Sequence, residues 1–576
     1  MIIVGIFAGH DAGAALFDDY RMVAAVALER MTRIKGDGDR FPDEAIDECL
    51  AVASLDRSDV DVLVLPYGSS LPAHCFRDFA WWDIGRKTRA TERIPLRQMQ
   101  FQRLSSIDGV FNARNFAVAN SFRPDVTIAF YTHHFAHALG SLFHTDWEDA
   151  ALYTADGGGD RLFYSARELR GRNLNALFGD FPESLRLRRP QHANASVALL
   201  YATVTSALGF VSLRHEGKVL GLAAYGKPRF AGWFQSCFAV DDQGRISGRR
   251  PRKVIRRKLE ELAAREPRED VAASVQHAVE DVSLKAVRNV LRRTMSRRVG
   301  VAGGLFANVR LNQRLAEECE LDELFVYPAM SDQGMAAGGV LQYLLERDGL
   351  RTWLDRRSRL KDVYLGRDYS ARANEAFRAA GAVGLSDGNA ARAAAYLIQR
   401  GAAVGTYIGR MEYGPRALGA RSILARATER AINDSLNKRL SRTEFMPFAP
   451  VVRKERVHEI FDLAPALAYS ANFMTTTCNV KKGWRDLIPA VVHVDGTARP
   501  QLIGRDQNSV YYDILVEYEK LSGLPVLINT SFNAHEEPII NTPDECAAAL
   551  VADRVDAVVT PTEVWAMPKR AEIYRR

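Results

Sequence analysis

The chain has 576 residues, more than one hydrophobic core organises, since single cores stop growing near roughly 250–300 residues. Hydrophobic residues make up 47% and charged residues 26% of the chain, which excludes global disorder and favours at least two globular domains. The formal net charge of +7 is small for this length and by itself excludes neither anionic small ligands nor nucleic acid.

The N-terminus and the cysteines indicate a cytoplasmic protein. Residues 1–9 are apolar, but no basic segment precedes them, and His10 and Asp11 follow too early for a signal sequence. No run approaches about 18 uninterrupted apolar residues, the usual length of a membrane span. The six cysteines stand singly, without C-x-x-C spacing, as free thiols do. We therefore expect no membrane partner.

Two β-rich segments predict an α/β fold. Residues 2–30 alternate apolar runs with turn residues, which indicates a β-meander. Residues 149–168 predict a second hairpin around the run DGGGD, whose glycines let backbone N–H groups approach a phosphate or acyl group closely. Because helical stretches follow each hairpin, we expect the duplicated core of the actin-like and sugar-kinase-like ATPase proteins.

A domain boundary is expected near residue 355, because a polar, arginine-rich stretch separates a glycine-rich segment from a fresh helical run. This divides the chain into residues 1–355 and 356–576. Residues 240–272 are dense in charge without interleaved aromatic residues, so we expect a solvated helix face there and no nucleic-acid partner. A homodimer is compatible with the sequence.

Two histidines indicate a metal site. His133 and His137 are four residues apart, so on a helix they share one face. No glutamate stands between them, which excludes the zinc-protease motif. Asp156 and Asp332 lie in glycine-rich turns and can add carboxylates. Such a set suits a divalent transition metal, with iron(II), manganese or zinc all chemically possible.

A series of long motifs resembles one family in order along the chain. That family is the NodU/CmcH O-carbamoyltransferases, which act on nodulation factors and antibiotics. The motifs are GHDAGAAL (9–16), HHFAHA (133–138), the TADGGGD hairpin, HEGKVLGLAAYGKP (215–228), VAGGLFANVRLNQRL (301–315), MSDQGMAAGG (330–339), GRMEYGPRALGARSILA (409–425), LNKRLSRTEFMPFAPVVR (436–453), HVDGTARPQ (493–501) and PVLINTSFNAHEEPI (525–539).

The resemblance implies a two-step, ATP-dependent reaction. Residues 356–576 would form a YrdC-like α/β domain that makes carbamoyl adenylate from carbamoyl phosphate and ATP. Residues 1–355 would resemble the tRNA threonylcarbamoyl-transfer proteins and pass the carbamoyl group to a hydroxyl of a small molecule, such as a sugar or a natural product. Family metal ligands fall on His133, His137, Asp156 and Asp332, with iron(II) as the expected ion. Family nucleotide contacts fall on Gly303, Gly304, Asn308, Glu216 and Lys218.

Residue chemistry supplies the remaining candidates. His10 or Asp11 could accept the proton of the acceptor hydroxyl, with His10 ranked first, and Lys35 could hold a phosphate or carbamoyl oxygen. Magnesium should accompany ATP, since it bridges phosphate oxygens. Ser531 and Asn533 could hydrogen-bond carbamoyl phosphate. The cations suited to the two anionic substrates are Arg410, Arg416, Arg421, Lys438, Arg442 and Arg499.

Two positions depart from the family pattern. Ser441 stands where a lysine is common, and His535 stands in a turn that often bears glycine before its glutamate.

Three alternatives remain open. Hydrogenase-maturation carbamoyltransferases carry an acylphosphatase module and C-x-x-C zinc repeats, which are not found here. A tRNA threonylcarbamoyl-transfer enzyme usually lacks the C-terminal half. A degenerate nucleotide-binding regulator would have lost its ligand residues.

Overall fold

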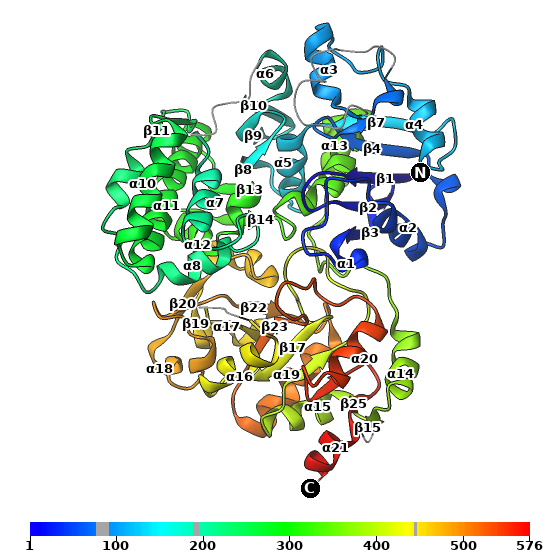
Figure 1. Ribbon diagram of the computed structural model, residues 1–576, viewed down its shortest axis with the longest axis vertical. Helices are drawn as coiled ribbons and strands as arrows, with labels where there is room; N and C mark the ends of the chain where they lie inside the picture. The colour runs from blue at the N-terminus through cyan, green and yellow to red at the C-terminus, as the bar shows by residue number, and fades with distance from the viewer. Residues whose placement is uncertain (77–91, 188–194, 387, 443–445, 576) are drawn as a thin grey trace.

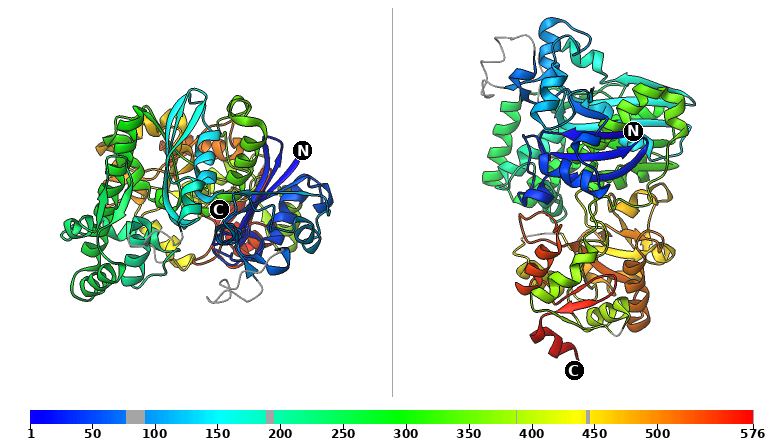
Figure 2. Two further views of the ribbon diagram at one scale, coloured as in Figure 1. Left: turned by 90° about the horizontal axis from the view of Figure 1, so that it is seen from above. Right: turned by 90° about the vertical axis from the view of Figure 1, so that its right-hand side faces the viewer.

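The structure is a computed structural model that describes residues 1–76, 92–187, 195–386, 388–442 and 446–575. The N-terminal part of the chain, blue to green, forms the upper half of the molecule and the C-terminal part, yellow to red, forms the lower half (Figure 1). Seen from above, the upper half has two lobes, with the blue first lobe and the green helices of the second on opposite sides of the cyan strands (Figure 2).

Each upper lobe is built on a five-stranded sheet. The first sheet has the order β3-β2-β1-β4-β7, and the second has the order β10-β9-β8-β13-β14. The strands are β1 (Ile2–Phe7), β2 (Gly13–Asp18), β3 (Arg21–Ala27), β4 (Val62–Pro66), β7 (Thr127–Tyr131), β8 (Asp149–Gly159), β9 (Leu162–Arg170), β10 (Asn173–Phe178), β13 (Arg298–Ala302) and β14 (Glu323–Val326).

Both sheets repeat one topology. In each, the first three strands form an antiparallel meander, and the fourth and fifth strands run parallel to the first. The meander expected at residues 2–30 and the hairpin expected at 149–168 are therefore both confirmed. The repeated strand order confirms the duplicated actin-like core.

Two long helices lie between the sheets. α5 (His133–Phe143) follows β7 directly, and α13 (Met335–Asp355) follows the loop that begins at Asp332. Both present apolar faces to one buried cluster, including Leu139 on α5 and Val340 on α13. The burial of these faces fixes where α5 begins, and thus where its first histidine lies.

Helices of the second lobe cover the outer face of its sheet. Of these, α7 (Val197–Ala207) and α11 (Arg268–Thr294) contact β8 directly, and α11 also contacts α8 (Glu216–Ala223), α9 (Ala231–Gln235), α10 (Arg252–Arg265) and α12 (Val309–Glu318). The short helix α6 (Phe181–Arg186) instead contacts α3 (Pro95–Gln102) of the first lobe. On α10, Ile255, Leu259 and Leu262 are buried at helical spacing while its basic residues face outwards. The solvated helix face expected in residues 240–272 is present.

The lower half is a mixed α/β domain. Its eight-stranded sheet has the order β15-β25-β24-β16-β17-β23-β18-β22, flanked by helices that include α15 (Ala390–Gln399), α16 (Ala431–Arg439) and α19 (Ser509–Ser522). The strands are β15 (Val383–Gly384), β16 (Val404–Thr406), β17 (Ser422–Arg426), β18 (Ala449–Arg453), β22 (Gln501–Ile503), β23 (Val526–Ser531), β24 (Ala557–Val559) and β25 (Val564–Ala566). The first strand of this sheet in the chain, β15, follows the end of α13, and the division at residue 355 stays a prediction.

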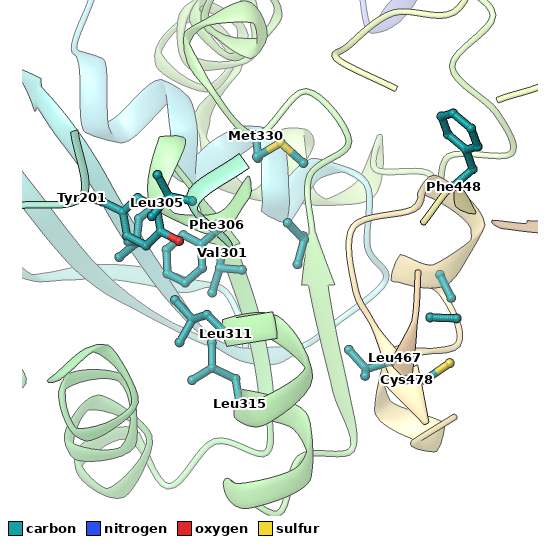
Figure 3. Close-up of a cluster of buried hydrophobic side chains, with 14 of the residues drawn as sticks. Tyr201, Val301, Leu305, Phe306, Leu311, Leu315, Met330, Phe448, Leu467 and Cys478 are labelled. Carbon is teal, nitrogen blue, oxygen red and sulfur yellow. The ribbon is translucent and has the colours of Figure 1, made fainter. Parts of the chain in front are cut away.

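The two halves share packed surfaces. One cluster of buried side chains includes Leu311 and Leu315 of α12 together with Leu467 and Cys478 of the lower half (Figure 3). Arg33 donates 2.8 Å hydrogen bonds to the carbonyl oxygens of Pro538 and Ile539. Residues that face this interface therefore hold fixed positions relative to one another. Among the helices of the described residues, none is both long enough and apolar enough to span a membrane.

Candidate active site

The predicted metal ligands converge at the start of α5. The Nε2 atoms of His133 and His137 lie 3.0 Å and 3.2 Å from Oδ2 of Asp156. Both Nε2 atoms lie 3.5 Å from Oδ1 of Asp332. One candidate ligand atom from each of the four side chains lies within 4.8 Å of the others, which is the arrangement that a single ion requires.

The carboxylates of Asp156 and Asp332 both lie outside regular α-helix or strand pairing, in turns of the backbone. Asp156 lies where the pairing of β8 with β9 shifts register, and its Oδ1 accepts a 2.6 Å hydrogen bond from the Gly157 N–H. The loop of Gly303 and Gly304 packs against this turn. Gly303 has φ +102°, and a Cβ there would lie 2.2 Å from the Ala155 carbonyl oxygen, so only glycine fits. The predicted Gly303 and Gly304 thus support Asp156 directly.

The electrostatics of the four residues fit a cation. Burial opposes ionisation of Asp156, yet hydrogen bonds from both imidazoles hold its pKa well below the ordinary value. Burial, together with the charge of Asp156, raises the pKa of Asp332. Oδ1 of Asp332 is buried without a hydrogen-bond partner among the described residues. A divalent ion would satisfy this atom and stabilise both carboxylates in their charged form.

His10 and Asp11 form a pair in the first turn. His10 Nδ1 lies 3.1 Å from Asp11 Oδ2, and Asp11 has φ +58°. The hydrogen bond with Asp11 raises the pKa of His10 to about 9 despite partial burial. A histidine with this pKa is protonated at neutral pH, which favours Asp11 over His10 as the proton acceptor, and the catalytic role of each residue stays a prediction.

A cavity of about 290 Å³ lies between the two halves of the molecule. The upper half contributes the predicted Lys35 and Lys218. The lower half contributes predicted residues that surround the same space, namely Arg416, Arg442, Arg499, Ser531 and Asn533. Burial lowers the pKa of Lys35, as expected for an ammonium group held away from water. The cavity is thus strongly cationic and draws its charge from both halves.

Arg442 organises the lower wall of this cavity. Its Nη1 donates a 2.8 Å hydrogen bond to Thr530 Oγ1. Its Nη2 contacts Ser531 Oγ at 3.1 Å and Asn533 Oδ1 at 2.9 Å. These bonds hold the predicted Ser531 and Asn533 side chains in the turn after β23, where they face the cavity.

Several predicted ligands lie elsewhere, and their assignment is corrected. Arg410 donates to the carbonyl oxygens of Val23, Leu365 and Gly366 at 2.6–2.8 Å, so it joins the halves. Arg421 is fully buried over the Tyr407 ring. Lys438 is exposed on α16 and does not line the cavity.

Two further residues that were predicted to contact the nucleotide instead form hydrogen bonds at the starts of helices. Asn308 caps α12 through Leu311 N and exchanges hydrogen bonds with Gln276. Glu216 accepts a 2.7 Å hydrogen bond from Leu213 N at the start of α8.

Three residues that were not predicted from sequence, His215, His535 and Glu536, line the same cavity. Nε2 of His215 lies 2.6 Å from Oε1 of Glu536, across the boundary between the halves. His535 stacks against His215 with ring centroids 5.9 Å apart. The departure from the family pattern at His535 was the available signal, but nothing in the spacing indicated that this turn meets the start of α8.

Comparisons with known proteins identify a family for this chain. The family model described as Carbamoyltransferase N-terminus matches residues 2–341, and the model described as Carbamoyltransferase C-terminus matches residues 395–566. Nodulation protein NolNO of Sinorhizobium fredii is 32% identical over 566 residues, covering 96% of this chain and 78% of that protein. Nodulation protein NolO of Bradyrhizobium diazoefficiens is 33% identical over 442 residues, covering 74% of this chain and 77% of that protein.

Among solved structures, HypF of T. kodakarensis aligns with 61% of this chain and 48% of its own, at 13% identity and a TM-score of 0.35. The assignment of the duplicated fold therefore rests on the strand order. The family matches extend over both halves, in the order that the motifs predicted. The chain belongs to the carbamoyltransferase family and is an enzyme that transfers a carbamoyl group.

Proposed function

We propose that the protein is an ATP-dependent O-carbamoyltransferase that uses carbamoyl phosphate, Mg²⁺ and iron(II) and acts in the cytoplasm on a hydroxyl of a small sugar or natural product. The observation that supports this most directly is the cationic cavity to which both halves contribute, with Lys35 and Lys218 facing Arg442 and Arg499. Two polyanionic substrates need such a concentration of positive charge.

The lower half carries the first reaction in this proposal. Water hydrolyses carbamoyl phosphate to carbamate and phosphate. A carbamate oxygen then attacks the α-phosphorus of ATP, and the bond to the departing pyrophosphate breaks, which leaves carbamoyl adenylate. Arg416, Arg442 and Arg499 would bind the phosphate oxygens, while Ser531 and Asn533 orient the carbamoyl group through hydrogen bonds. Magnesium accompanies ATP.

The upper half carries the second reaction. The acceptor oxygen attacks the carbamoyl carbon, the bond to AMP breaks, and the Asp11 carboxylate takes the acceptor proton. His133, His137, Asp156 and Asp332 would hold the iron(II). A bound divalent cation supplies Lewis acidity that polarises a carbonyl group. His10, protonated at neutral pH, holds Asp11 in place through their 3.1 Å contact.

Pyrophosphate release tests the proposal. Purified protein is incubated with ATP, Mg²⁺ and carbamoyl phosphate, with iron(II) and candidate acceptors added in parallel. We expect release by the native protein and its loss in Arg499→Ala. Arg505→Ala is the matched control, because Arg505 pairs with Asp513 at the surface outside the cavity. No release from the native protein, with or without acceptors, would exclude carbamoyl-adenylate chemistry.

A further inference from the structure

A second cavity, of about 330 Å³, lies between the two upper lobes on the far side of α5 from the metal ligands. Tyr67 and Phe130 line it from the first lobe, and Phe181 lines it from the second. The Tyr67 ring stacks on the rings of Phe181 and Phe130, at centroid distances of 4.6 Å and 5.3 Å. Phe135, two residues beyond His133 on α5, adds a further aromatic surface. These rings form a flat apolar part of the wall, and the rest of the lining is polar, with Thr132, Arg167 and Gln342 among its residues.

Arg167 on β9 provides the positive charge of this cavity. Its side chain is buried, with 5% of the residue exposed, and its guanidinium lies 4.2 Å above the Phe135 ring. Nε and Nη1 are both buried without a hydrogen-bond partner among the described residues. Burial lowers the pKa of Arg167 to about 10. A buried guanidinium with unmet donors is unfavourable unless a ligand completes it.

The two carboxylates that line the cavity are engaged elsewhere. Asp180 caps α6 by accepting a 2.9 Å hydrogen bond from Glu183 N. Glu346 accepts a 2.7 Å hydrogen bond from Gln342 and is exposed at the mouth. Neither contacts Arg167 through a hydrogen bond. The charge of Asp180 raises the pKa of Arg167 but forms no hydrogen bond with it, so the guanidinium can pair with one oxyanion, and the two carboxylates would repel a second negative charge on the same ligand.

We propose that this interlobe cavity is a second ligand site, and that it binds a small organic monoanion with a flat apolar body, such as an aromatic carboxylate. A carboxylate oxygen can accept a hydrogen bond from Nε or from Nη1 of Arg167, two donors that point to opposite sides of the guanidinium. The body of the ligand lies among Tyr67, Phe130, Phe135 and Phe181. The ligand contacts both lobes and the back of α5, whose front bears His133 and His137. This site is distinct from the carbamoyl-transfer chemistry and needs neither ATP nor metal.

The probe is benzoate. Its binding is measured as a shift in the thermal unfolding midpoint of the full-length protein at constant ionic strength. Benzamide is the uncharged analogue and benzylamine the cationic one. Arg167→Met removes the charge and keeps the length of the side chain. Arg172→Met is the matched control, because Arg172 lies exposed in the turn after β9.

We expect millimolar benzoate to raise the midpoint of the native protein and of Arg172→Met. In Arg167→Met the apparent dissociation constant for benzoate should rise by roughly tenfold or more, because a charged hydrogen bond is lost. Without ligand, Arg167→Met should unfold at the same temperature or higher, because an unpartnered buried charge is replaced by an apolar chain. If Arg167→Met does not fold, Arg167→Lys replaces it, since lysine keeps the charge but loses the Nε and Nη1 donors.

Three results would overturn the proposal. Benzamide or benzylamine could stabilise the protein as much as benzoate does, which would assign the cavity to another ligand class. The benzoate shift could persist in the Arg167 variants, which would place the anion elsewhere. Benzoate could also produce no shift in the native protein.

Discussion

The backbone N–H of His133 donates a 2.7 Å hydrogen bond to the carboxylate of Asp160. Asp160 ends the glycine-rich hairpin that begins at Asp156, and Asp156 contacts the ring of the same histidine at 3.0 Å. The hairpin therefore holds His133 at both its backbone and its side chain. The geometry of the proposed metal ligands thus depends on Asp160, which is not one of the four candidate ligands.

Replacing Asp160 should weaken metal binding. Asp160→Ala removes the acceptor for His133 N–H, and we expect the affinity for iron(II) to fall about 10–100-fold, as for other supporting hydrogen bonds. Asp160→Asn keeps an acceptor oxygen and tolerates the φ of +48° found there, so it should bind nearly as tightly as the native protein. Anaerobic calorimetric titration measures both, and equal affinities for Ala and Asn would contradict the supporting role.

Adding one methyl group at Gly159 should disrupt the metal site. A Cβ at Gly159 would lie 2.0 Å from Cγ of the His133 ring. The ring must then move, so Gly159→Ala should lose metal binding and carbamoyl transfer while the fold persists. Gly232→Ala on α9 is the control, since a Cβ there meets nothing within 4 Å. Titration and circular dichroism together check the outcome, and unchanged metal affinity in Gly159→Ala would refute the close fit.

Arg421 should prove to be structural. It donates 3.0 Å hydrogen bonds to the carbonyl oxygens of Ala420 and Gly409, and its guanidinium lies 3.8 Å from the centre of the Tyr407 ring. Arg421→Met should lower the free energy of unfolding by about 2–4 kcal/mol, because buried carbonyl groups lose their donors.

The matched control for that change is Arg430→Met, an exposed position where we expect a change within about 0.5 kcal/mol. Urea unfolding compares the two variants. A stable Arg421→Met that has lost pyrophosphate release would instead restore Arg421 as a substrate ligand.

His144 should make the protein acid-sensitive. Burial lowers its pKa to about 4, and its ring stacks on Tyr327 with Nδ1 3.3 Å from the Ser358 carbonyl oxygen. Because the folded-state pKa lies below the unfolded value near 6.5, this contribution to stability is complete above about pH 6.5 and is lost as the pH falls towards 4.

The expected size follows from linkage. Between pH 7 and pH 5 the native protein should lose about 2 kcal/mol through this histidine, and His144→Asn should remove that loss because asparagine keeps a donor and does not titrate. The exposed His74→Asn is the control. Urea unfolding at the two pH values measures the difference, and an unaltered loss in His144→Asn would assign the effect to other groups.

The sequence alone determined the local elements and the chemistry of the metal ligands. Four-residue spacing on a helix places His133 and His137 on one face whatever surrounds them, and glycine beside Asp156 requires a tight turn. The strands are buried on both faces and therefore appear as continuous apolar runs bounded by turn residues, so both hairpins were predicted at their observed positions. The order of the motifs was sufficient to identify the family, because an unrelated protein is very unlikely to carry so many long motifs in the same order.

Only the tertiary structure decided which cations meet a common cavity. Arg410, Arg421 and Arg442 are chemically equivalent in the sequence, and all three donate to carbonyl oxygens, yet of the three Arg442 alone lines the cavity between the halves. Likewise, Arg167 resembles any strand arginine until the packing of α5 buries it against Phe135. Burial and partners depend on contacts between residues far apart in the chain, and residue spacing does not encode those contacts.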